Sequence, residues 1–124
     1  MSIPHPYDRF RREVITRAGI SEVIPYADIV EIFNSRNNLD ADNRKAVELA
    51  EANGLLTSGV SDAHMPMELG RTYVEMPDFD GTPEEFKKSL AQGTIVARKM
   101  SPLIHVITTL VKIKKRIGCG NVAN

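Results

Sequence analysis

Cysteine is nearly absent from this chain of 124 residues, in which Cys119 is the one cysteine. A single cysteine excludes a disulfide within the chain and is typical of a reducing compartment, so we expect a cytoplasmic protein. Net charge is absent too, because sixteen basic residues balance sixteen acidic ones. This balance gives no indication of a nucleic-acid partner or of binding to anionic membranes.

Long apolar runs are also missing. The longest apolar stretch, SPLIHVITTLVKI at 101–113, contains a histidine and two threonines, and it is too short and too polar to cross a bilayer. The sequence shows no signal peptide, and it has neither GxGxxG nor a P-loop, which argues against a nucleotide-binding module. A soluble domain is therefore expected, and the length favours a single one.

Segments of strand type alternate along the chain with segments of helix type. After an extended entry at 1–6, strands are predicted over 27–34, 55–61, 71–77 and 94–100. Helices are predicted over 8–18, ending near Gly19, and over 40–54, 82–93 and 101–118. Strands separated by such helices predict right-handed βαβ units, and hence an α/β protein with a parallel sheet.

Three of these helices carry clear signals. The helix at 82–93 has Thr82 as its cap, Pro83 at its first position and Glu85 three residues after the cap. The helix at 40–54 has acidic residues in its first turn and Gly54 as its stop. The last helix has an apolar stripe formed by Leu103, Ile107, Leu110, Ile113 and Ile117.

Functional groups of parallel sheets collect at the carboxyl ends of the strands, where His5, Asn34, Asp62 and His64 are expected. Asp62 and His64 are two residues apart, so on an extended segment their side chains point to the same side. A carboxylate and an imidazole in this arrangement are ligands for a divalent zinc, manganese or iron ion. The alternative is a turn in which Asp62 caps the next segment and His64 is exposed.

His5 lies between two prolines, which give its backbone a fixed direction suited to a metal ligand; the alternative is a surface turn. Arg9 and Arg12 follow, and their guanidinium groups suit a substrate phosphate, although several arginines are also common on exposed helices. His105 lies off the apolar stripe of the last helix, and we expect it to be solvated. Ser61 and its neighbouring glycines would let the backbone come close to a bound group.

Three segments, IPHPYDRFRR, ADIVEIFNSR and NRKAVELAEANGLLTSGVSDAHMPMELG, together resemble the later motifs of the PHP (polymerase and histidinol phosphatase) domain. The resemblance implies part of a distorted seven-stranded β/α barrel that holds two or three metal ions and hydrolyses phosphoester bonds. It implies that His5, Asp62 and His64 bind metal. It places Arg9 near the position of an arginine that contacts phosphate in relatives. It also places Asn34 beside the site, which this residue shapes.

PHP domains open with an H-x-H pair and further ligands, none of which precedes His5 here. Residues 1–118 therefore look like the carboxyl-terminal part of such a domain, without its N-terminal strands, and 119–124 like a flexible tail. We expect the Mn, Zn or Fe ions to be incompletely liganded by this chain. We also expect a homodimer or a missing N-terminal half as partner, because half a barrel leaves open edges. Two hypotheses follow: a metal-dependent phosphoesterase acting on a phosphate ester such as a nucleotide or nucleic-acid end, or a non-catalytic remnant that self-associates.

Overall fold

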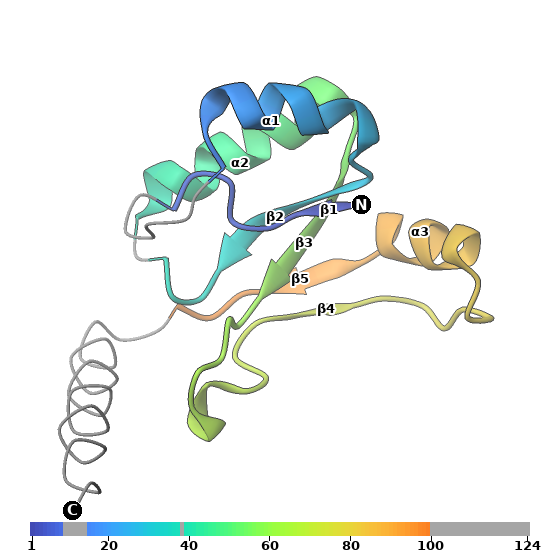
Figure 1. The fold of residues 1–124 in the computed structure, drawn as a ribbon. Coiled ribbons are helices and arrows are strands. Elements are labelled where there is room, and N and C mark those ends of the chain that lie inside the picture. The colour runs from blue at the N-terminus through green and yellow to red at the C-terminus, as the bar shows by residue number, and fades with distance from the viewer. Residues whose placement is uncertain (9–14, 38, 100–124) are drawn as a thin grey trace, which may run out of the picture.

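The computed structural model describes residues 1–8, 15–37 and 39–99. In this part the chain is a mixed α/β protein with a parallel three-stranded sheet of order β1-β2-β3 and a two-stranded sheet β4-β5 (Figure 1). The elements are β1 (Ser2–Ile3), α1 (Arg17–Val23), the 3-10 helix η1 (Ile24–Tyr26), β2 (Ile29–Asn34), α2 (Asp40–Asn53), β3 (Leu56–Val60), the 3-10 helix η2 (Pro66–Glu68), β4 (Tyr73–Glu75), α3 (Pro83–Ala91) and β5 (Thr94–Val96).

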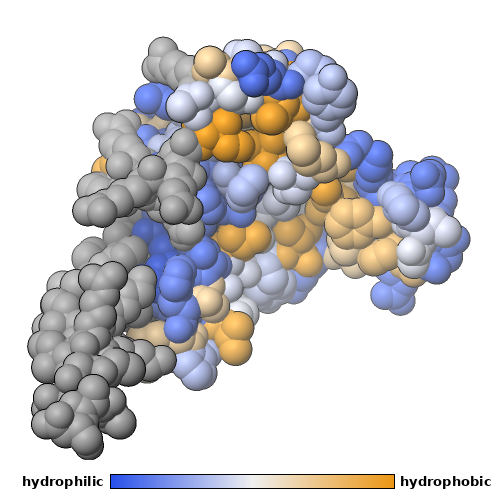
Figure 2. Space-filling model, viewed as in Figure 1, coloured by the Kyte–Doolittle hydropathy of each residue, from blue (hydrophilic) through white to orange (hydrophobic). Residues whose placement is uncertain are grey.

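The core lies between the parallel sheet and helices α1 and α2, which cover the same face of it (Figure 1). Ile3 of β1 and Val30 of β2 are fully buried against Ala46 and Ala50 of α2. The two alanines have short side chains, so the helix backbone lies close to the sheet. Figure 2 shows apolar residues gathered where the two helices meet the strands.

The predicted helices at 40–54 and 82–93 are confirmed as α2 and α3. Gly54 has φ 62°, a left-handed conformation that suits glycine, and its N–H donates to the Ala50 and Glu51 carbonyls, so α2 ends there. The Thr82 hydroxyl accepts the N–H of Glu85 at 3.3 Å, which fixes the start of α3. The end of α2 and the start of α3 therefore lie where Gly54 and Thr82 place them.

Of the helix predicted over 8–18, the structure shows Arg17 and Ala18 as helical, while Asp8, Ile15 and Thr16 lie outside any helix. Instead α1 spans Arg17–Val23, because the Thr16 side chain caps the helix by accepting the N–H of Gly19 at 3.1 Å. Gly19 therefore lies in the first turn of α1 and does not end a helix. Residues 9–14 of the predicted helix lie outside the described residues.

The prediction of a wholly parallel sheet is wrong for the last two strands. β4 and β5 pair antiparallel, although α3 lies between them in the sequence. The hydroxyl of Ser89 in α3 donates to the Pro77 carbonyl, which holds the helix to the segment that leads into it. α3 thus lies at one end of the pair, and the chain returns as β5 beside β4 without a crossover (Figure 1). Residues 73–96, from β4 to β5, are called the arm below.

The arm is held against the parallel sheet at two points. A Cβ built on Gly59 of β3 would lie 2.6 Å from Cγ2 of Ile95, so β5 packs closely over this glycine. At the other end of the arm, Lys87 donates to Asp28 at 2.5 Å. The Lys87 ammonium, with the amino group of Met1, lowers the pKa of Asp28 to about 2.

Several predictions reach beyond these elements. The described ranges form an open sheet and no closed barrel. The helix at 101–118, with His105 and the apolar stripe, and the tail at 119–124 lie outside the described residues. None of the helices in the described ranges is both long and apolar enough to span a membrane.

We predict that Gly59→Ala lowers the free energy of unfolding by about 1–3 kcal/mol, because the new methyl group collides with Ile95. Urea denaturation followed by circular dichroism measures this change. In a Gly59→Ala/Ile95→Ala double variant the loss should be smaller than the sum of the single losses by at least about 0.5 kcal/mol.

Gly54→Ala is the control, since no atom lies within 4 Å of its added Cβ and its cost of about 1 kcal/mol comes from the positive φ alone. Its effect should add to that of Ile95→Ala. Full additivity for Gly59→Ala as well would contradict the packing of β5 on β3.

Candidate functional site

The candidate site lies at the edge of the parallel sheet where the three strands end, called the carboxyl edge below. His5 follows β1, Asn34 is the last residue of β2, and Asp62 and His64 follow β3. In the register of the sheet Ile3 lies beside Val30, and Asn34 beside Val60. Because β1 ends before β2 and β3 do, His5 starts from a lower level of the sheet than Asp62 and His64.

The carboxylate of Asp62 is held by the amide of Asn34, which is 2% exposed. The Asn34 amide nitrogen donates to Oδ2 of Asp62 at 3.2 Å and to Oε1 of Glu31 at 3.0 Å. Its oxygen accepts the backbone N–H of Arg36 at 2.9 Å, which fixes the direction of the amide. One amide group thus fixes two carboxylates, and Glu31 is a member of the site that we did not predict.

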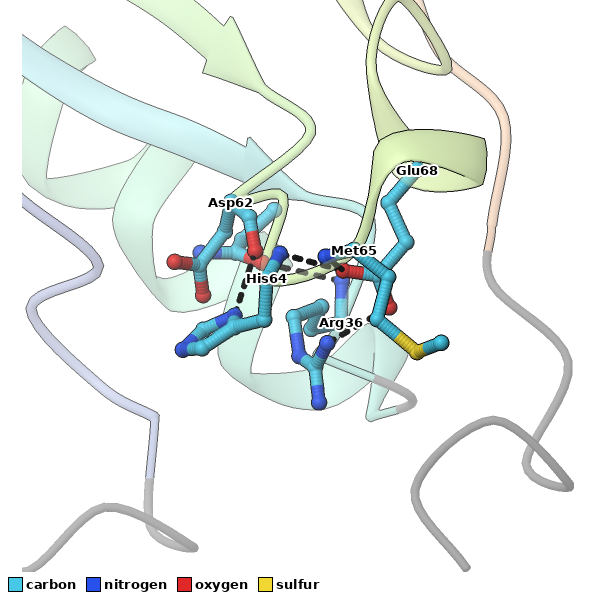
Figure 3. A network of polar contacts seen from close by, with 6 residues as sticks. Arg36, Asp62, His64, Met65 and Glu68 are labelled. Atoms are coloured by element: carbon cyan, nitrogen blue, oxygen red, sulfur yellow. Dashed lines mark hydrogen bonds and ion pairs between the residues drawn. The ribbon is translucent and has the colours of Figure 1, made fainter. Parts of the chain in front are cut away.

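The imidazole of His64 is oriented by the residue two positions before it. Nδ1 of His64 lies 2.8 Å from the backbone carbonyl of Asp62 (Figure 3). A carbonyl only accepts, so Nδ1 is the protonated nitrogen and Nε2 carries the lone pair of the neutral ring. The backbone of Asp62 has φ 49°, a left-handed conformation that costs energy in a residue other than glycine, and its carbonyl lies within hydrogen-bonding distance of Nδ1.

His5 also has a strained backbone, with φ 25° between its two prolines. Its Nδ1 atom is buried and has no hydrogen-bond partner. A buried nitrogen without a partner is costly, and such groups are rare in folded proteins. This nitrogen and the Nε2 lone pair of His64 are donors of the kind that zinc, manganese and iron accept.

These donors do not make a complete metal centre. Across residues 1–8, 15–37 and 39–99, no three His, Cys, Asp or Glu side chains form a group that could hold a metal ion. The carboxyl edge therefore fits a divalent ion in the kind of donor it offers but not in the number of ligands. Ser61 follows β3 directly and is half-buried, while Arg9 and Arg12 lie outside the described residues.

Comparison with known proteins finds a family similar to part of this chain. Residues 40–95, which include Asp62, His64 and Glu68, match a family described as PHP-associated. This match supports a PHP-associated region over 40–95. An uncharacterized protein of Methanocaldococcus jannaschii is 36% identical over 94 residues, which cover 68% of this chain and 39% of that protein. The chain thus spans about two fifths of the length of this relative, and no solved structure matches it.

A buried ion pair that sequence reasoning missed joins Glu68, inside the matched region, to Arg36, which precedes it. Glu68 in η2 is fully buried, and its Oε1 accepts from Nη1 of Arg36 at 2.6 Å. Its other oxygen, Oε2, accepts the backbone N–H of Met65 at 3.0 Å and the N–H of His64 (Figure 3). The loop that carries His64 is thereby attached to the end of β2.

The surroundings of Glu68 favour its charged form. Burial alone would raise the pKa of its carboxyl group. The His64 N–H, the charge of Arg36 and the Met65 N–H outweigh burial, so the pKa of Glu68 lies below its usual value. The carboxylate is therefore ionised at neutral pH in the folded chain.

A weak signal for Glu68 is present in the sequence. Pro66 stands at the first position of η2 and Glu68 at the third, the same pattern as Pro83 and Glu85 in α3. The pattern was harder to see here because Met65, at the cap position, has no side-chain oxygen. Arg36 offers no such signal, since its partner is 32 residues away.

We predict that Glu68→Gln lowers the free energy of unfolding at pH 7 by about 3 kcal/mol or more, because it removes the charged carboxylate from the buried ion pair with Arg36. A depressed folded-state pKa gives stability that is present above the unfolded value of about 4.3 and is lost as pH falls through the folded value. Urea denaturation from pH 7 to pH 3 should therefore show a smaller acid loss in Glu68→Gln than in the wild type.

Glu51→Gln, on the exposed face of α2, is the matched control and should change neither quantity by more than about 0.5 kcal/mol. Equal acid losses in the wild type and Glu68→Gln would contradict the role given to this carboxylate.

Proposed function

We propose that this chain supplies the carboxyl-terminal part of a PHP-like, metal-dependent phosphoesterase that hydrolyses phosphoester bonds. The observation that carries the proposal is the pairing of His64 and Asp62 after β3, within the PHP-associated region. The imidazole has its lone pair on Nε2, and the carboxylate is fixed by Asn34. Both groups are thus prepared as ligands before any ion arrives.

In this proposal the parallel sheet is a part of a distorted seven-stranded β/α barrel. His5, Asp62 and His64 contribute to the binding of Mn, Zn or Fe, and Asn34 and Ser61 shape the site. Arg9 and Arg12 bind the phosphate of the substrate. A divalent ion would supply a nucleophile from water near neutral pH and neutralise charge on the phosphoryl group.

The remaining ligands must come from outside the described residues, because the donors found there do not complete a centre. An N-terminal polypeptide that completes the barrel is the source that fits a chain spanning two fifths of its relative. We propose this part, or a second copy of the chain, as the partner.

The second candidate is a non-catalytic remnant or accessory module that self-associates. The incomplete set of ligands in the described residues favours it. The two candidates differ in what the chain binds, so metal content and molecular mass separate them.

The phosphoesterase proposal predicts that the purified chain binds Mn²⁺ or Zn²⁺ and that Asp62→Ala weakens this binding at least about tenfold. Calorimetry and metal analysis after dialysis measure this change. Asp78→Ala, on an exposed loop of the arm, is the matched control and should leave the affinity unchanged.

Hydrolysis of p-nitrophenyl phosphate and its diester with added metal tests the reaction itself. Full-rate hydrolysis that is lost in Asp62→Ala would refute the remnant. Absence of bound metal at micromolar concentration, with a dimeric mass in solution, would count against the phosphoesterase proposal.

A further inference from the structure

The loop after β3 is held by a side chain that bonds the main chain of His64. Glu68 is fully buried and binds the N–H groups of His64 and Met65 with one oxygen and Arg36 with the other. Figure 3 shows Glu68 reaching from η2 to the main chain of the loop and to Arg36, which follows β2. The carboxylate thus sets where the backbone of His64 lies relative to β2.

The imidazole of His64 is held at a second point. Its Nδ1 atom donates to the Asp62 carbonyl at 2.8 Å, and this contact forms only while the His64 backbone and the left-handed Asp62 keep their relative places. One contact holds the main chain and the other holds the ring. Displacement of the main chain would therefore break the Nδ1 contact and allow the ring to adopt the tautomer protonated at Nε2.

We propose that Glu68 is a positioning residue for His64. By holding the His64 N–H, it keeps Nδ1 on the Asp62 carbonyl and directs the Nε2 lone pair away from the main chain. The consequence for metal binding rests on the function proposed above, but the effect on the tautomer does not. Arg36 stabilises Glu68 and in this proposal acts on the imidazole through it.

Nitrogen-15 NMR of the metal-free chain tests the proposal directly. Spectra are recorded at about pH 8.5, two units above the ordinary histidine pKa of about 6.5. The His64 signals are assigned by comparison with His64→Gln. In the wild type we expect the tautomer protonated at Nδ1 to predominate, and a ring protonated mainly at Nε2 would overturn the proposal.

Three variants separate positioning from general loosening. Glu68→Ala should shift His64 toward the tautomer protonated at Nε2. Glu68→Gln keeps a carbonyl oxygen that can accept the His64 N–H, so it should retain the wild-type tautomer. Arg36→Gln removes the ion pair but leaves Glu68 in place, so it should lose stability and keep the tautomer.

An equal shift in Arg36→Gln and Glu68→Ala would overturn the proposal, because it would show that any loss of stability frees the ring. If Glu68→Ala does not fold, the wild type, Glu68→Gln and Arg36→Gln still decide the question. A shift of His64 toward the tautomer protonated at Nε2 in both variants would refute the proposal. Amide spectra of each variant establish that it is folded.

Zinc calorimetry links the result to function. If the wild type binds Zn²⁺, Glu68→Ala should weaken binding by about 10–100-fold while Glu68→Gln retains most of it. A wild type that shows the expected tautomers but binds no zinc would refute the proposed metal site and leave the positioning role intact. If the wild type binds zinc and Glu68→Ala changes neither the affinity nor the tautomer of His64, the positioning role alone is refuted.

Discussion

The carboxylate of Glu68 is the group on which the geometry of the carboxyl edge depends. A fully buried carboxylate is very costly unless its oxygens are bonded, and here a guanidinium group and two main-chain N–H groups bond it. These partners come from the end of β2 and from the loop after β3. The requirement to satisfy one charge therefore brings two strand ends together and fixes the loop that carries His64.

Polar contacts continue along the same edge. The side chains of Ser35 and Thr72, both buried, lie 2.6 Å apart, and the Thr72 hydroxyl accepts the backbone N–H of Arg98 at 3.1 Å. The residues just after β2, just before the arm and just after it thus share one network. Apolar packing holds the opposite part of the molecule, between the sheet and helices α1 and α2. Hydrogen bonds are directional, so the polar edge fixes side-chain directions that apolar packing alone leaves open.

Local signals predicted much of the fold. The bounds of α2 and α3 followed from Gly54 and Thr82, because a cap acts on neighbours in the sequence. The start of α1 was missed, because arginines and apolar residues before Thr16 also have helix propensity. The antiparallel pairing of β4 and β5 was missed as well, because it depends on where α3 packs, and βαβ reasoning assumes that each helix crosses the sheet.

The sequence by itself determined which residues follow the strands of the parallel sheet, since alternating apolar segments and their stops are local properties. It thereby determined that His5, Asn34, Asp62 and His64 come at strand ends, while their role as ligands and supports stays a prediction. Only the tertiary structure decided that Glu31 shares the Asn34 amide with Asp62 and that Arg36 and Glu68 meet in the interior. Those contacts join residues from separate segments, and a buried charge finds its partner through the packing of the whole chain, which no spacing along the sequence encodes.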